Sequence, residues 1–371
     1  MNPAPEPDSA QVVTTPGILQ PGVDVPDGAL YLPATAAHTL WGRLPCATDV
    51  AVLTVEPGTE VVIDTVSHEG ILDDQGRDPV AFFGQHGVPR DAVLDDAIEI
   101  AASEGRRDAG SDGPHVITGP VAVTGAEPGD LLTMTLVRAE PRVPYGVISN
   151  RHGRGALPDE FPQGVMNVSV FAAADVHAGV GMLPRVAGGE RDVTFPLRPF
   201  LGIMGVAAAG SSRPHSVPPG PFGGNIDINL LVEGASLHLP VQVPGGLAYV
   251  GDPHFAQGDG EVALTAMEAS LRVTVRFDLT KRDEALAAFG AIAGPLAETA
   301  EYLVPTGLSE DLDEAVRNCV RAAIDLLHAR YGMDPDLAYA YLSAATDFDI
   351  SQVVDLVKGV HARIRKADFG E

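Results

Sequence analysis

The sequence of 371 residues contains only two cysteines, Cys46 and Cys319. They lie far apart in different kinds of segment, so neither a disulfide framework nor a CxxC metal site is available. The N-terminus lacks the basic and apolar regions of a signal peptide, and no run of about eighteen apolar residues occurs that could cross a membrane. These absences predict a cytoplasmic protein without disulfides.

Basic residues are also scarce, because 24 Lys and Arg stand against 50 Asp and Glu, which gives a formal net charge of -26. Such a chain repels nucleic acid and anionic lipid, since binding to either depends on cations that displace counterions. The acidic surface is best explained by solubility. Neither nucleic acid nor a membrane is therefore an expected partner.

Long amphipathic helices are missing from the first three quarters of the chain. Residues 1–28 are rich in Pro, Asp and Gly, which predicts a flexible N-terminal arm without chemistry. From 29 to 280, short β-branched runs alternate with Pro-Gly turns, which favours one β-rich body, a sandwich or barrel, over repeated βαβ units. The clearest predicted strands are Ala51–Val55, Glu60–Val66, Val121–Val123, Leu131–Leu136 and Leu271–Phe277.

The character of the sequence changes at 281–371, where segments with a 3.6-residue period begin. Cys319 falls on the apolar side of one of them and is expected in the core. The fold class is therefore mainly β, sandwich-like or barrel-like, with a helical α/β C-terminal portion. Three of the expected helices run from Asp283 to about Ala300, from Pro335 to about Ala345, and from Ser351 to about Arg365. A further helix is expected to begin after Ser309, which is its predicted N-cap.

Common hydrolytic nucleophiles are missing as well. Only three lysines occur, and two of them are close to the C-terminus. A catalytic site that pairs a lysine with a serine or cysteine nucleophile would therefore depend on Lys281 alone. No GxSxG nucleophile elbow is present, and Cys46 lacks a context that marks an activated thiolate. Ser211 or Ser212 with His215 as base stays open as an alternative. By exclusion, a metal-activated water becomes the leading hypothesis.

The segment GGNIDINLLVEG (223–234) is the first candidate source of metal ligands. Asn225, Asp227 and Asn229 alternate with apolar residues, so they would line one face of a strand. Short Asx residues are unfavourable in strands. Their alternation therefore indicates that this face binds something.

A second segment, 249–271, carries a denser group of ionisable residues. Asp252 and His254 are separated by one residue, so they project the same way from an extended chain. Two glycines that follow permit a tight turn that returns Glu261 toward them. Together these side chains offer the mixed N/O set that Zn²⁺ or another divalent metal accepts.

The remaining histidines are less informative. Four lie in loop-like contexts from which a side chain could reach a cleft, namely His68, His86, His115 and His152. Four more, His38, His177, His328 and His361, are expected to be solvated or structural.

With these residues in view, the chain resembles the acetamidase/formamidase family. The resemblance implies hydrolysis of a small carboxylic amide to the acid and ammonia, a β-rich fold, self-association as a homodimer or higher oligomer, and a metal-bearing cleft. Two segments, SHEGILDDQGRDP (67–79) and SNRHGRGALPD (149–159), are not among the family features, which leaves the acyl group of the substrate open. The resemblance is carried by LPATAAHTLWG (32–42), GPHVITGPVAVTGAEPGDLL (113–132), PFLGIMGVA (199–207) and the stretch from Gly223 to Glu261.

The hypothesis is that a divalent metal assists the attack of water on the amide. Zn²⁺ is the first choice and Ca²⁺ the second, and the predicted ligands are Asp227, Asp252 and His254. The metal would polarise the carbonyl and lower the pKa of a bound water. The sequence leaves open which carboxylate is a ligand and which is the base.

Proton transfer is assigned to Glu261 or to the nearby Asp259, because ammonia leaves poorly unless it is protonated. His115 or backbone N–H groups would stabilise the oxyanion. The competing class is a non-catalytic β protein that binds a small ligand and holds a structural Ca²⁺.

Overall fold

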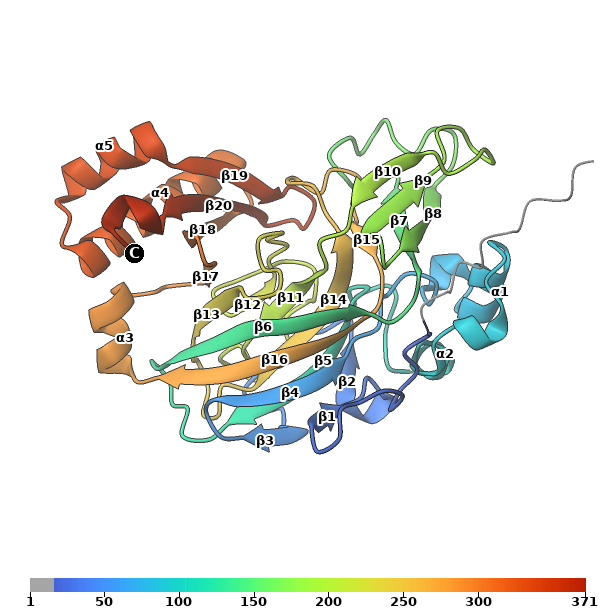
Figure 1. The fold of residues 1–371 in the computed structure, drawn as a ribbon, viewed down its shortest axis with the longest axis horizontal. Coiled ribbons are helices and arrows are strands. Elements are labelled where there is room, and N and C mark those ends of the chain that lie inside the picture. The colour runs from blue at the N-terminus through green and yellow to red at the C-terminus, as the bar shows by residue number, and fades with distance from the viewer. Residues whose placement is uncertain (1–16, 104) are drawn as a thin grey trace, which may run out of the picture.

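The computed structural model describes residues 17–103 and 105–371, and most of its regular structure is β (Figure 1). The strands form two large sheets, of nine and eleven strands. The longer helices follow residue 281. The prediction of a mainly β chain with a helical α/β C-terminal portion is therefore confirmed.

The nine-stranded sheet combines strands from both halves of the chain. Its spatial order is β1, β4, β16, β6, β13, β17, β18, β20 and β19. The bounds in that order are Leu30–Leu32, Thr59–Asp64, Leu271–Thr280, Leu131–Pro141, Ser236–Pro240, Leu296–Glu298, Tyr302–Ser309, Lys358–Arg365 and Asp347–Gln352. Strand β16 pairs antiparallel with both β4 and β6. The C-terminal strands thus extend a sheet that begins near the N-terminus.

The eleven-stranded sheet contains the strand with the predicted ligands. Its main path is β10, β9, β8, β7, β15, β14, β11 and β12, and β5 pairs with β14, β2 and β3. The path has the bounds Val193–Pro196, Val180–Leu183, Asn167–Asp175, Tyr145–Arg151, Met267–Glu268, Ala248–Ala256, Phe200–Gly205 and Gly223–Asn225. The other three strands are β5 (Val116–Val123), β2 (Thr39–Trp41) and β3 (Leu53–Val55). Because β14 pairs with β11, β15 and β5, it lies in the interior of this sheet.

The main hydrophobic core lies between the two sheets. Ile63 of β4 and Val273 of β16 come from the first sheet, and Leu201 of β11 and Val250 of β14 come from the second. All four side chains are buried. Burial of branched side chains from two facing sheets is what stabilises a β-sandwich.

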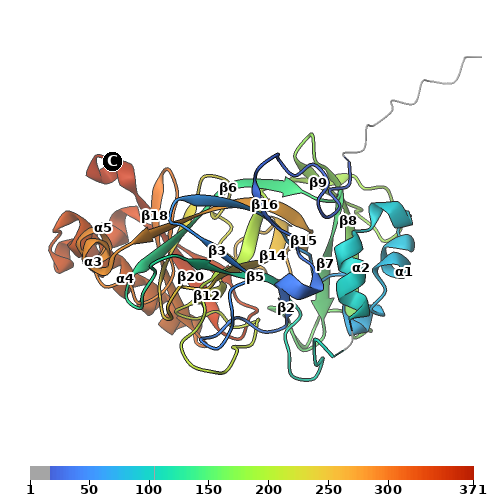
Figure 2. The ribbon, with the colours of Figure 1, turned by 90° about the horizontal axis from the view of Figure 1, so that it is seen from below.

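Helices cover the two ends of the molecule, as the turned view in Figure 2 shows. One end carries α1 (Pro79–Gly84) and α2 (Asp95–Ala102), and the other carries α3 (Arg282–Phe289), α4 (Leu312–Tyr331) and α5 (Pro335–Ala345). Short 3₁₀ turns lie at Ala36–His38, Asp73–Gln75, Arg90–Ala92 and Lys366–Phe369. No helix within the described residues is long and apolar enough to cross a membrane.

Helix α4 lies close to β18 because Gly307 has no side chain. A Cβ at Gly307 would overlap the backbone of Ala315 and Cys319. The Cys319 side chain is buried at this contact, and its Sγ lies 3.3 Å from the carbonyl oxygen of Pro305. The expectation that Cys319 belongs to the core is confirmed.

Three predictions about the C-terminal portion are wrong. The helix expected from Ser351 to about Arg365 is instead the end of β19, a loop and β20, because alternate residues of β20 pack beneath α4. The helix expected from Asp283 to about Ala300 ends at Phe289 and is followed by β17. The N-cap of α4 is Asp311, whose carboxylate accepts a hydrogen bond from the Glu314 N–H, and not Ser309.

The predicted N-terminal arm falls into two parts. Residues 1–16 lie outside the described residues. Residues 17–28 contact the body, since the Leu19 N–H donates to the Arg142 carbonyl at 3.0 Å and Arg272 donates to the Gln20 carbonyl at 3.1 Å. The domain boundaries at 28 and 280 stay predictions.

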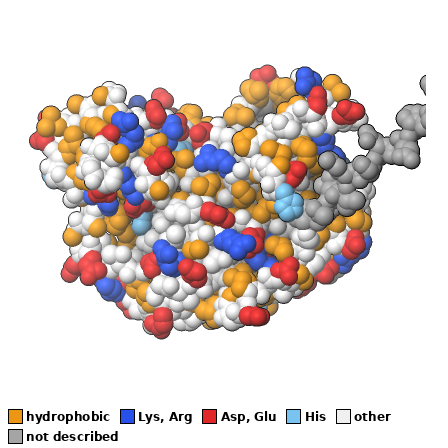
Figure 3. All heavy atoms as spheres, viewed as in Figure 1, with side chains coloured by type: hydrophobic (Ala, Val, Ile, Leu, Met, Phe, Trp, Pro, Cys, Tyr) orange, Lys and Arg blue, Asp and Glu red, His pale blue; other side chains and the backbone are white. Residues whose placement is uncertain are grey.

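The face shown in Figure 3 carries acidic and basic side chains in close alternation. The surface also carries exposed ion pairs, such as Arg138 with Glu140 and Arg276 with Asp278. Exposed pairs of this kind contribute little to stability.

Two arginines in the interior form a different kind of contact. Arg142 and Arg272 are 0% and 1% exposed. Asp64 lies between them, 2.7 Å from Arg272 Nε and 3.6 Å from Arg142 Nη2, and Arg142 Nη1 donates to Asp96 at 2.7 Å. Backbone carbonyls of residues 19–23 accept further N–H groups from both arginines. This network joins β4, β16, α2 and the N-terminal segment.

We expect Asp64→Asn to lower the free energy of unfolding by about 3–5 kcal/mol, because it leaves two buried guanidinium groups without their shared anion. Denaturant unfolding measures the loss. The matched control is Asp278→Asn, whose partner Arg276 is solvated, and we expect it to cost less than about 1 kcal/mol. Equal losses in the two variants would contradict the importance of the buried network.

Candidate active site

The two acidic segments of the sequence meet in one buried cluster. Asp252 and His254 lie on β14, with Asp252 Oδ2 3.1 Å from His254 Nε2. Asp227 follows β12, and its Oδ1 is 4.0 Å from His254 Nδ1. One donor atom from each of the three residues lies within 4.8 Å of the other two. The structure thus brings the three predicted metal ligands together.

Three acidic residues of the cluster have an unusual backbone. Asp227, Asp252 and Glu261 have φ angles of 47°, 51° and 46°, in the left-handed region. Such angles cost energy for residues other than glycine, and they concentrate at functional sites. The backbone here is held in the conformation that aims these carboxylates inward.

The prediction that Asn225, Asp227 and Asn229 share one face of a strand is wrong. Strand β12 ends at Asn225, and the left-handed turn at Asp227 interrupts the extended chain. The intervening isoleucines, Ile226 and Ile228, are buried too. The alternation in the sequence arises because the whole loop is buried: Asp227 belongs to the cluster, Asn229 donates to the Gln257 carbonyl and to Asp259, and the isoleucines belong to the core.

Gly202 of β11 provides the space that the cluster occupies. A Cβ at this position would collide with the carboxylates of Asp227 and Asp252 and with the ring of His254. The Gly202 carbonyl accepts a hydrogen bond from the Asp227 N–H at 3.2 Å. A glycine is therefore required for the ligands to approach this strand.

Three more carboxylates complete the cluster. Glu261 enters from the predicted tight turn, in which its N–H donates to the Gly258 carbonyl at 3.1 Å. Glu268 lies on β15, with Oε1 3.1 Å from His254 Nε2. Asp355, in the loop between β19 and β20, has a carboxylate oxygen within 4.8 Å of those of Asp227 and Glu261. Neither Glu268 nor Asp355 was predicted from the sequence, although an isolated glutamate in an apolar stretch is a usable signal for Glu268.

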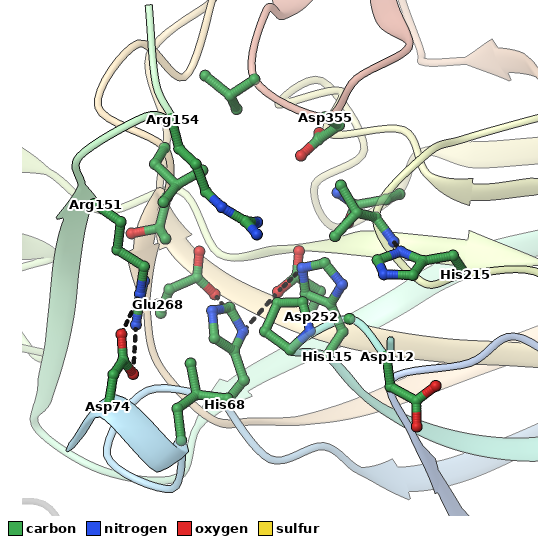
Figure 4. A pocket seen from close by; sticks show the side chains of 18 of the residues that line it. His68, Asp74, Asp112, His115, Arg151, Arg154, His215, Asp252, Glu268 and Asp355 are labelled. Atoms are coloured by element: carbon green, nitrogen blue, oxygen red, sulfur yellow. Dashed lines mark hydrogen bonds and ion pairs between the residues drawn. The ribbon is translucent and has the colours of Figure 1, made fainter. Parts of the chain in front are cut away.

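Two histidines flank Asp252 on its outer side, and Figure 4 shows both imidazole rings directed toward it. His68 Nδ1 lies 3.3 Å from Asp252 Oδ1, and His115 Nε2 lies 3.8 Å from the same oxygen. The other nitrogen of His115, Nδ1, is hydrogen-bonded to Ser216 Oγ at 2.9 Å. Ser216 therefore fixes the ring so that Nε2 faces the cluster.

Burial and mutual repulsion make three of the carboxyl groups difficult to ionise. Burial raises the pKa of Glu261 well above its usual range, and the negative charge of Asp227 adds to the effect. Burial and the negative charge of Asp355 also raise the pKa of Asp227 well above its usual range. The pKa of Asp355 is raised well above its usual range by burial and by Glu261. A cation at this point would remove the repulsion.

Asp252 differs from the other carboxyl groups. Burial opposes its ionisation, but the imidazoles of His115, His254 and His68 hold its pKa well below the usual range. Burial also opposes protonation of His68, but Asp252 and Glu69 outweigh it and raise the pKa of His68 to about 10. Burial lowers the pKa of His115 to about 3, so this ring is neutral. Asp252 is therefore an anionic centre with imidazoles around it.

Unpaired buried atoms indicate what the cluster lacks. Among the described residues, eleven buried side-chain N or O atoms have no hydrogen-bond partner, and seven of them belong to this site. Native proteins normally pair such atoms. The residues fit a divalent cation, because most of the unpaired atoms are carboxylate oxygens, and their residues belong to overlapping groups whose donor atoms lie within 4.8 Å of one another. The seven are His68 Nδ1, Asn225 Oδ1, both carboxylate oxygens of Asp227, Asp252 Oδ1, Glu268 Oε2 and Asp355 Oδ2.

A cavity of about 280 Å³ leads from the surface to the cluster. Asp252, Glu261 and Glu268 are among the residues that line it, together with His68 and His115. Three arginines line it too, namely Arg151 at the end of β7 and the loop residues Arg107 and Arg154. A small molecule can therefore reach the buried carboxylates.

Several residues considered in the sequence analysis lie elsewhere. Asp259 accepts a hydrogen bond from Asn229 Nδ2 at 3.0 Å and lines a separate hollow beside Val262. His86 stacks on Phe171, and His152 is exposed. None of Asp259, His86 and His152 lines the cavity described above.

The serine alternative finds little support in the geometry. Ser211 and Ser212 are exposed and do not line the cavity, whereas His215 does. His215 Nδ1 accepts a hydrogen bond from the Val217 N–H at 3.1 Å, so this nitrogen is not paired with a serine. The serine that does contact a site histidine is Ser216, which is fully buried.

Comparisons with known proteins agree with this description. The sequence model of the Acetamidase/Formamidase family matches residues 106–214 and 207–364. The chain is 29% identical over 303 residues to a formamidase of Methylophilus methylotrophus, which covers 65% of this chain and 74% of the relative. It is 26% identical over 300 residues to an acetamidase of Mycolicibacterium smegmatis, which covers 62% and 73%.

Solved structures show the same fold. An acetamidase from Yersinia enterocolitica superimposes with a TM-score of 0.72 at 23% identity, covering 95% of this chain and 96% of that one. An acetamidase from Bacillus halodurans gives a TM-score of 0.71 at 22% identity, covering 92% and 98%.

We expect Gly202→Ala to abolish tight binding of Zn²⁺ to the chelator-treated protein, because the added methyl group displaces Asp227, Asp252 and His254. Calorimetric titration measures the affinity. The control is Gly84→Ala in α1, where a Cβ meets open space, and it should bind as the wild type does. Wild-type affinity in Gly202→Ala would argue against these three ligands.

We expect Asp355→Asn to stabilise the chelator-treated protein by at least about 1 kcal/mol, roughly the energy of one pKa unit, because it removes a charge that Asp227 and Glu261 repel. Thermal unfolding with and without added Zn²⁺ or Ca²⁺ measures both effects. The added cation should raise the unfolding temperature less in the variant than in the wild type. A variant that is less stable without metal would show that repulsion does not dominate the cluster.

Proposed function

The chain belongs to the acetamidase/formamidase family, and from that premise we propose that it hydrolyses a small linear carboxylic amide to the acid and ammonia at the buried cluster. The observation that carries this proposal is the convergence of Asp227, Asp252 and His254 in one buried group, of which Asp252 lines the cavity. The relatives named formamidase and acetamidase support short primary amides as the substrate class.

We propose that Asp227, Asp252 and His254 hold a divalent cation, with zinc as the first choice because an imidazole and carboxylates suit it. When bound, such a cation polarises an amide carbonyl and lowers the pKa of a water that it coordinates. Asp227, Glu261 and Asp355 form an overlapping set of oxygen donors alone, which suits calcium better. Metal analysis of the purified protein decides between these two ions.

Glu261 is the proposed proton carrier. Its raised pKa makes its carboxylate form a stronger base toward the attacking water, and the acid that results can deliver the proton to the departing nitrogen. The oxygen of the water joins the carbonyl carbon, whose π electrons move to the amide oxygen, and the C–N bond breaks when the carbonyl re-forms and the nitrogen receives the proton. Glu261 lines the cavity, whereas Asp259 does not.

His115 is the proposed donor to the oxyanion. The ring is neutral because burial lowers its pKa, and Ser216 occupies its Nδ1. When the Ser216 hydroxyl donates to Nδ1, the proton of the ring resides on Nε2, which faces the cavity. An N–H in this position can stabilise negative charge on the amide oxygen.

The alternatives are less well supported. A buried Ser216 cannot be reached by a substrate, and a purely structural Ca²⁺ site does not explain the imidazoles around Asp252. Membership of an amidase family also disfavours a non-catalytic binding protein. The cytoplasmic location and self-association expected from the sequence stay predictions.

We expect the wild type to release ammonia from formamide or acetamide, and Glu261→Gln to lower kcat by at least about a hundredfold, the usual scale for a lost acid–base group. Asp259→Asn should retain most of the activity. Chelation should remove the activity, and either Zn²⁺ or Ca²⁺ should restore it. Full activity after exhaustive chelation would overturn the role of the metal, and a larger loss in Asp259→Asn would reassign the proton carrier.

A further inference from the structure

We infer that the substrate amide carries a carboxylate on its acyl chain and that Arg154 binds this group. The inference rests on the proposed function and adds a specificity-determining residue to it. It starts from the three arginines that line the cavity, because only one of them is free to bind a ligand.

Two of these arginines are already neutralised by acidic side chains. Arg107 is paired with Asp73, and its Nε donates to the Gly113 carbonyl at 2.7 Å. Arg151 lies 2.7 Å from Asp74 and 3.3 Å from Glu69. Their guanidinium groups support the wall of the cavity and have little capacity left for a ligand.

Arg154 has no such partner. Within residues 17–103 and 105–371, no ion pair or side-chain hydrogen bond engages its guanidinium group. Figure 4 shows this group directed into the cavity, above His115 and Asp252. Its N–H donors form the planar fork that binds a carboxylate through two parallel hydrogen bonds.

The backbone on both sides of Arg154 is fixed to the chain that follows Glu261. The Asn150 side chain donates to the Ala263 carbonyl at 2.7 Å, and the Ala156 N–H donates to the Val262 carbonyl at 2.9 Å. The loop that carries Arg154 is therefore held in register with the proposed proton carrier. A group bound by Arg154 would have a defined position relative to the reacting carbonyl.

The charge of the cavity explains why an anionic substrate needs this arginine. The chain has a formal net charge of -26, and the cavity is lined by many carboxylates. An anion would be repelled from such a surface unless a local cation compensates for it. The lining carboxylates are those of Asp73, Asp74, Asp112, Asp252, Glu261, Glu268 and Asp355.

The size of the cavity also favours a substrate longer than acetamide. A water molecule occupies roughly 30 Å³, and formamide and acetamide need the space of only a few. The cavity of about 280 Å³ can therefore accept the half-amide of a short dicarboxylic acid. Two segments contribute to its wall, namely 67–79, which lies outside the residues matched by the family model, and 149–159. This is where a subgroup with a different acyl group would differ.

The test compares succinamate with butyramide, which has the same chain length without the carboxylate. We expect the wild type to have a kcat/KM at least about tenfold higher for succinamate, and Arg154→Gln to reduce this ratio about ten- to a hundredfold, mainly through KM. Arg154→Lys should reduce it less. The control Arg185→Gln removes the same charge at an exposed ion pair with Asp192 and should leave the ratio unchanged.

The outcomes separate this inference from the proposed function. Turnover of butyramide with the same ratio in wild type and Arg154→Gln overturns the inference and leaves the amidase function intact. If no amide releases ammonia, the proposed function fails, and calorimetric binding of succinamate then tests Arg154 directly. Binding that is weakened at least about tenfold in Arg154→Gln supports the inference, whereas equal binding, or none in the wild type, overturns it.

Discussion

Repulsion among buried carboxylates is the constraint on which the rest of this structure depends. Asp227, Glu261 and Asp355 come from three distant segments, yet their oxygens lie within 4.8 Å of one another, away from water. Left alone, such an arrangement costs free energy, because each charge is desolvated and repels the next. Other interactions in the fold must compensate for this free energy. A bound divalent cation would make the same group of carboxylates stabilising, because each carboxylate would be attracted to it.

The scaffold meets this constraint by holding the cluster from several directions. Strand β14 lies inside the larger sheet and carries Asp252 and His254, while Gly202 on β11 leaves the space beside them. Left-handed backbone at three acidic residues stores strain that an isolated loop could not sustain. The hydrophobic core between the two sheets and the Asp64 network offset that cost.

The sequence predicted those parts of the site that depend on local spacing. Asp252 and His254 both lie on β14, although the left-handed backbone at Asp252 departs from a regular strand, and the glycines before Glu261 form the expected turn. It did not predict Asp355, because residues 351–365 have an apolar spacing that also fits a helix, and only packing beneath α4 selects the strand. His68 was left unassigned, since its role depends on Asp252, which lies far along the chain.

Paired and unpaired arginines divide the cavity into two functional parts. Arg107 and Arg151 form ion pairs with acidic residues of 69–74, so the positive and negative charges on this part of the wall neutralise one another. Negative charge is in excess at the carboxylate cluster, which therefore attracts a cation. Positive charge is in excess at Arg154, which therefore attracts an anion. A molecule whose carbonyl faces the carboxylate cluster with its proposed cation, and whose carboxylate faces Arg154, would be oriented by both contacts. If the proposed substrate binds here, the direction in which the amide enters would be set by the distribution of unpaired charge as well as by the shape of the cavity.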